Sequence, residues 1–121
     1  MRVLIVDDYL DTTDMLAHLV RIKGHEAWTA NDGLSAVELA VEFEPHIVLL
    51  DIGMPIIDGY ETARRMRQHV ALAGTRIYAF TAGPYDPVRA DEAGFVGWFS
   101  KPLRIDELLR VLEVDGEATI A

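Results

Sequence analysis

The pattern of hydrophobic and polar positions along this chain alternates between that of a β-strand and that of an α-helix. Five short apolar or alternating runs, bounded by turn residues, predict strands at residues 2–6, 25–30, 47–50, 76–80 and 97–100. The segments between and after them carry apolar residues three or four positions apart, the spacing of one helix face. This alternation predicts an α/β fold, with a parallel sheet, right-handed crossovers and helices on both faces.

Start and stop signals predict where the helices lie. Gly24 ends the first helix, expected from residue 12 or 13 to residue 23, and Pro45 ends the second, expected over 34–44. The third begins at Asp58 and Gly59, which we interpret as a structural turn and cap. The fourth is short, over 87–93, because an Asp-Pro start and a glycine stop leave it under two turns. The last begins near residue 105.

Length and composition narrow the class of protein. The chain has 121 residues, half of them hydrophobic, so we expect one domain over 1–121, with 113–121 as an acidic tail and no effector domain. No apolar run approaches the roughly 18 residues of a membrane helix, and the start does not resemble a signal peptide. The lack of cysteine excludes disulfides and is compatible with a cytoplasmic location. A net charge of −9 disfavours direct nucleic-acid binding.

Carboxylates follow two of the predicted strands at the points where these strands stop. Asp7 and Asp8 come after the first strand, and Asp51 comes after the third. The carboxyl ends of parallel strands share one edge of the sheet, where open α/β folds bind their ligands. Thr81 and Lys101 follow the fourth and fifth strands and belong to the same edge. The sequence therefore predicts a site there that binds a cation and does chemistry.

These residues, in this order, resemble the receiver domain of two-component response regulators. The resemblance rests on the Asp7-Asp8 pair, on Asp51 within the segment DIGMPIIDG, on Thr81-Ala82 and on Lys101-Pro102, and it covers essentially the whole chain. It implies a doubly wound, flavodoxin-like (βα)5 domain with strand order 2-1-3-4-5. It also implies that Asp51 accepts a phosphoryl group from a histidine kinase or histidine phosphotransfer protein.

The resemblance implies roles for the other site residues. Asp8, Asp51 and the backbone carbonyl of Gly53 would bind Mg²⁺ (or Mn²⁺), with Asp7 acting through water. Lys101 would pair with a phosphoryl oxygen, and its peptide bond to Pro102 would be cis. Thr81 would turn its hydroxyl to the phosphoryl group, while an aromatic residue of the fifth strand fills the space it leaves.

Charge explains why this chemistry needs a metal ion. Three carboxylates and one ammonium sum to −2, and a phosphoryl group adds about −1.5 to −2 more. Mg²⁺ is a hard ion that binds one or two carboxylates and keeps several waters, so it suits such a site. With the charge balanced, positioning and electrostatic stabilisation account for most of the expected catalysis.

The chain departs from the family pattern at several positions. Trp98 stands where the family has tyrosine or phenylalanine; its indole is larger and only donates hydrogen bonds, so it is either a switch residue or a core residue. The short fourth helix leaves monomer and weak dimer both open. Gly53 and Gly83 follow Asp51 and Thr81 by two positions and offer no side chain to orient water, which leaves the dephosphorylation rate open.

The leading interpretation is a phosphorylation-dependent signalling switch that acts on a downstream protein still to be identified. It is either a single-domain regulator or a receiver module of a hybrid histidine kinase, and it catalyses only its own phosphorylation and dephosphorylation. An aspartyl-nucleophile phosphohydrolase of the haloacid-dehalogenase kind is disfavoured, because Gly53 stands where those enzymes need a second acid. A nucleotide-binding module is disfavoured because the turn after the first strand has no glycine.

Overall fold

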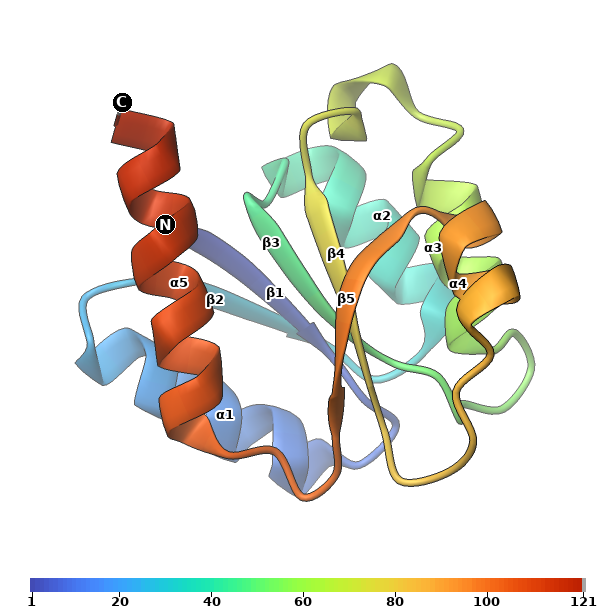
Figure 1. Cartoon of the computed structure of the whole chain (residues 1–121), viewed down its shortest axis with the longest axis horizontal. Coiled ribbons are helices and arrows are strands. Elements are labelled where there is room, and N and C mark those ends of the chain that lie inside the picture. The colour runs from blue at the N-terminus through green and yellow to red at the C-terminus, as the bar shows by residue number, and fades with distance from the viewer. Residues whose placement is uncertain (121) are drawn as a thin grey trace.

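Five parallel strands form one sheet at the centre of the molecule (Figure 1). The computed structural model describes the backbone of residues 1–120 and the side chains of residues 1–113. The strands are β1 (Arg2–Val6), β2 (Glu26–Ala30), β3 (Ile47–Asp51), β4 (Arg76–Thr81) and β5 (Phe95–Ser100). Their order is β2-β1-β3-β4-β5, which confirms the flavodoxin-like topology.

Within the described residues, α-helices cover both faces of the sheet (Figure 1). One face carries α1 (Leu10–Ile22) and α5 (Ile105–Ile120), and the other carries α2 (Gly33–Phe43), α3 (Gly59–Met66) and α4 (Pro87–Ala93). A short 3₁₀ helix, η1 (Val70–Leu72), precedes β4 and was not predicted. No helix of the described chain has the length and apolar character needed to span a membrane.

The two faces of the sheet support separate cores because successive side chains of a strand point to opposite sides. On β1, Val3 and Ile5 pack with residues of α1 and α5. Leu4 and Val6 pack with residues of α2, α3 and α4. All five residues of β3 are buried, as expected for a central strand covered on both faces.

Several element boundaries differ from those predicted. α1 begins at Leu10, ahead of the expected residue 12 or 13, and Tyr9 stands at the N-cap position without a side-chain cap. β5 begins at Phe95, two residues earlier than expected, and its pairing with β4 is irregular near Tyr78. The segment expected as an acidic tail is helical as far as Ile120, and residue 121 lies outside the described residues. The short α4 has the predicted bounds.

Candidate functional site

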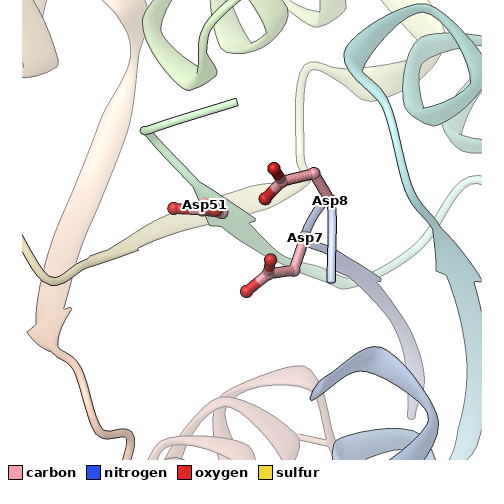
Figure 2. Close-up of side chains that lie close together, drawn as sticks. All are labelled: Asp7, Asp8 and Asp51. Atoms are coloured by element: carbon pink, nitrogen blue, oxygen red, sulfur yellow. The ribbon is translucent and has the colours of Figure 1, made fainter. Parts of the chain in front are cut away.

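Three carboxylates meet at the carboxyl edge of the sheet, where β1 and β3 end side by side. Asp7 and Asp8 follow β1, and Asp51 is the last residue of β3. One oxygen of each lies within 4.8 Å of the others, and Figure 2 shows the side chains of Asp7 and Asp8 extending toward the side occupied by Asp51. Asp7 and Asp51 are buried, whereas Asp8 is exposed. The site therefore has a buried acidic floor and one acid open to solvent.

Lys101, which directly follows the edge strand β5, contacts two of these acids. Its Nζ lies 2.8 Å from Asp7 Oδ2 and 3.3 Å from Asp51 Oδ2. The ammonium also lies 4.7 Å from the centroid of the Phe80 ring on β4, and the Lys101–Pro102 peptide bond is cis. The sequence-based prediction that residues 94 positions apart meet here agrees with this geometry.

Burial and neighbouring charges set the protonation of this group of residues. The pKa of the Asp51 carboxyl is raised by burial and by the Asp7 carboxylate, against the opposing effects of Lys101 and the Gly53 N–H. Burial alone would lower the pKa of Lys101, but its hydrogen bond to Asp7 and the charges of Asp51 and Asp7 raise it overall. Lys101 therefore stays protonated, and its single positive charge offsets only part of the negative charge of the three carboxylates.

Two backbone N–H groups hold the polar side chains at the ends of β3 and β4. The Gly53 N–H donates to Asp51 Oδ1 at 3.2 Å, and the Gly83 N–H donates to Thr81 Oγ1 at 3.1 Å. Thr81 is buried, and its carbonyl accepts a hydrogen bond from the Lys101 N–H at 2.9 Å. A Cβ at either glycine would meet no atom closer than 4.0 Å, so the space beside both glycines is open.

Asp58 and Gly59 shape the start of α3 beside the site. Asp58 Oδ1 accepts a hydrogen bond from the Glu61 N–H at 2.9 Å, which caps the helix. Gly59 lets the helix approach β3, because a Cβ there would lie 2.5 Å from the Asp51 carbonyl oxygen and 2.6 Å from Ile52 Cα. Both residues therefore position the strand end that carries Asp51.

Asp8, Asp51, Thr81 and Lys101 all line one open cavity of about 560 Å³. Asp58, Tyr60 and Arg89 complete its wall on the side of α3 and α4. Neither Tyr60 nor Arg89 was predicted from the sequence as a site residue. No motif marks Arg89; only its place in the first turn of the helix after Thr81 pointed to this edge of the sheet.

Trp98, on β5, is not among the described residues that line this cavity. Its side chain is 48% exposed, and its ring stacks on Tyr85 of the β4–α4 loop with centroids 4.8 Å apart and an angle of 14° between planes. It is therefore a surface aromatic in contact with the loop that follows Thr81, and its role as a switch stays a prediction.

The donor atoms of the acidic cluster match a hard divalent cation. Asp7, Asp8 and Asp51 each offer a carboxylate oxygen, the ligand type that Mg²⁺ prefers, and the Asp8 side chain remains open to water. The neighbouring Lys101 compensates part of the charge without closing the cavity. The residues present fit a Mg²⁺ site that retains several waters.

Comparison with known sequences places the chain among signalling proteins. It is 33% identical over 109 residues to sporulation initiation phosphotransferase F of Bacillus subtilis, covering 88% of this chain and 86% of that protein. It is 32% identical to the regulatory protein AtoC of Escherichia coli and to the sensor histidine kinase RcsC of Salmonella typhi. These two matches span 93% and 97% of this chain, respectively, but only 24% and 12% of the length of AtoC and RcsC.

Solved structures agree with this placement. The chemotaxis protein CheY4 of Vibrio cholerae superimposes with a TM-score of 0.86 at 29% identity, covering 93% of this chain and 95% of that one. The model of the response regulator receiver domain matches residues 3–113. Family match, strand order and the acids at the sheet edge lead to one conclusion: this chain belongs to the receiver domain family of two-component response regulators.

Proposed function

We propose that this receiver domain is switched by transfer of a phosphoryl group to Asp51 from a histidine kinase or a histidine phosphotransfer protein. The observation that carries the proposal is the meeting of three carboxylates and Lys101 Nζ at the sheet edge, where Asp8, Asp51 and Lys101 line one cavity. Asp51 is the buried acid that lines this cavity, so a donor that enters the cavity meets its carboxylate.

The reaction forms a bond between an Asp51 carboxylate oxygen and phosphorus while the bond from phosphorus to the donor breaks. Burial and the Gly53 N–H orient the attacking carboxylate. Asp8, Asp51 and the Gly53 carbonyl would hold Mg²⁺, with Asp7 acting through water. When bound, the ion supplies positive charge that offsets the repulsion between the acids and the phosphoryl oxygens.

Lys101 and Thr81 respond to the new group. Lys101 already lies 3.3 Å from Asp51 Oδ2, so its ammonium reaches a phosphoryl oxygen attached there after a small movement. The Thr81 hydroxyl accepts only the Gly83 N–H among the described hydrogen bonds, and its proton is available to another phosphoryl oxygen. Movement of Thr81 would shift the loop that carries Tyr85 and thereby the Trp98 contact.

The relatives support the proposed partners. Matches to a sensor histidine kinase, a sporulation phosphotransferase and a regulatory protein support a place in a phosphorelay, either as a separate regulator or as a module of a hybrid histidine kinase. We propose that it acts in the cytoplasm through contact with a downstream protein, as a monomer or weak dimer, without binding nucleic acid itself. The net charge of −9 supports the last point.

Intact mass after incubation with acetyl phosphate and Mg²⁺ tests the proposal. We expect one added phosphoryl group, which is absent in Asp51→Asn and absent when EDTA removes the metal. Asp11→Asn is the matched control, since it removes an exposed α1 acid and should leave the gain intact. A gain that survives Asp51→Asn would place the acceptor on another residue and refute the proposal.

A further inference from the structure

Arg89 is a second cation beside the proposed phosphoacceptor. Among the described residues that line the Asp51 cavity, Lys101 and Arg89 carry positive charge. Arg89 sits in the first turn of α4, directly after the loop that leaves Thr81. The roles proposed for the acids, Thr81 and Lys101 do not involve Arg89. Its place in the cavity wall suggests a role of its own.

The two cations reach the cavity from opposite faces of the sheet. Lys101 lies over Phe80, which belongs to the core shared with α1 and α5. The Arg89 guanidinium lies 4.2 Å from the centroid of the Tyr60 ring, and Tyr60 belongs to the core shared with α2, α3 and α4. An anion that enters the cavity above Asp51 therefore has a cationic side chain on each side.

Arg89 is oriented by its neighbours but weakly paired. The Tyr60 ring that supports it is itself fixed, since its hydroxyl accepts a hydrogen bond from the Asp86 N–H at 2.8 Å. The acid partner of Arg89 is Asp58, whose Oδ2 lies 3.4 Å from the guanidinium nitrogen, and the Arg89 side chain is 54% exposed. A long, exposed ion pair contributes little, so a doubly charged phosphoryl group can displace it.

We propose that Arg89 binds the anionic phosphoryl donor at the mouth of the cavity and keeps contact with the phosphoryl group on Asp51. The guanidinium exchanges Asp58 for phosphoryl oxygens while it remains stacked on Tyr60. With acetyl phosphate, an Asp51 oxygen bonds to phosphorus, the bond from phosphorus to the acetyl oxygen breaks, and acetate leaves with the electron pair. This inference rests on the proposed function, because it gives Arg89 a part in that same transfer.

Phosphorylation kinetics of Arg89→Gln against Arg64→Gln test the inference. Arg64 is the matched control: its side chain is also 54% exposed, it pairs with a glutamate on α3, and its loss changes the net charge equally. The rate of phosphoryl gain is measured by intact mass over a range of acetyl phosphate concentrations with saturating Mg²⁺. For Arg89→Gln we expect the half-saturating concentration to rise about threefold to tenfold, with a smaller change in the rate at saturation.

Two further variants separate charge from packing. Arg89→Met keeps an apolar stem against Tyr60 and should show the same rise, whereas Arg89→Lys should recover at least half of the loss. Mg²⁺ affinity, measured by titration calorimetry, should be unchanged in Arg89→Gln, Arg89→Met and Arg89→Lys. A half-saturating concentration for Arg89→Gln and Arg89→Met no higher than that of Arg64→Gln overturns the inference, as does a lysine variant as weak as the glutamine variant. If the inference alone is wrong, the wild type still gains a phosphoryl group. If the wild type gains none, the proposed function is overturned as well.

Discussion

Lys101 Nζ lies 2.8 Å from Asp7 Oδ2, and this contact joins the end of β5 to the end of β1 across the ends of β3 and β4. Asp7 is fully buried, and its other oxygen accepts the Tyr9 N–H at 2.9 Å. A buried carboxylate needs such partners, because its desolvation is otherwise uncompensated. The pair therefore supports the fold as well as the proposed chemistry.

Replacement of Lys101 by methionine should destabilise the metal-free protein. It leaves the buried Asp7 and Asp51 carboxylates without their ammonium, and we expect the free energy of unfolding to fall by about 2 kcal/mol. Urea unfolding in the presence of EDTA measures this. Lys23→Met, at an exposed position, is the control, and an equal loss in both variants would show that the pair contributes nothing specific.

Replacement of Asp8 by asparagine should have the opposite effect on stability. Asp8 has an oxygen within 4.8 Å of oxygens of Asp7 and Asp51, so its loss relieves repulsion in the metal-free state. We expect the free energy of unfolding to rise by about 1 kcal/mol in EDTA and the stabilisation by Mg²⁺ to disappear. Urea unfolding with and without Mg²⁺ is the measurement. Asp14→Asn, which removes another exposed acid, should retain the Mg²⁺ response.

Replacement of Gly59 by alanine should displace the strand end that carries Asp51. The added Cβ would meet the Asp51 carbonyl oxygen and Ile52 Cα, which are backbone atoms that cannot move independently of β3. We expect a loss of about 2 kcal/mol or more in unfolding free energy and a slower phosphoryl gain. At Gly74 a Cβ would meet nothing within 4 Å, so Gly74→Ala should stay within about 0.5 kcal/mol of the wild type. Equal stability of the two variants would contradict the close approach.

The sheet and the acidic cluster could be predicted because they depend on short-range patterns. The period of the apolar residues gives each strand and helix, and the parallel topology then brings Asp51 and Lys101 to one edge. The Arg89–Tyr60 and Trp98–Tyr85 contacts could not be predicted in this way. They depend on how far α4 and its loop lie from α3 and β5, which is set by packing and not by the pattern of any one segment.

Stability should fall in mildly acidic solution because of His46. Its pKa lies below the ordinary value through burial, with Arg2 and the chain N-terminus acting in the same direction, and its Nδ1 accepts the Arg2 N–H at 2.9 Å. The folded protein thus binds fewer protons than the unfolded chain below about pH 6.5, so this stabilisation is complete above that pH and is lost as pH falls toward the lowered pKa.

Urea midpoints at about pH 7.5 and about pH 5.5 measure the effect of this histidine. His46→Gln can still accept the Arg2 N–H but does not titrate, so we expect a smaller drop between the two pH values than in the wild type. His69→Gln, at an exposed position, is the control. If the urea midpoint of His46→Gln falls between the two pH values as much as that of the wild type, the pH dependence belongs to other groups.

Trp98 should report the state of the site through the loop that it contacts. In Trp28→Phe, Trp98 is the remaining indole, since the sequence has two tryptophans, and its stacking on Tyr85 couples its emission to the β4–α4 loop. If Thr81 moves toward a phosphoryl group, the loop moves with it and the stack changes. We expect a saturable change in emission when beryllofluoride, which mimics an acyl phosphate, is added with Mg²⁺. Adding Thr81→Ala to this variant should abolish the change while Mg²⁺ still binds. Emission of Trp28→Phe that stays constant at saturating beryllofluoride would refute a switching role for Trp98.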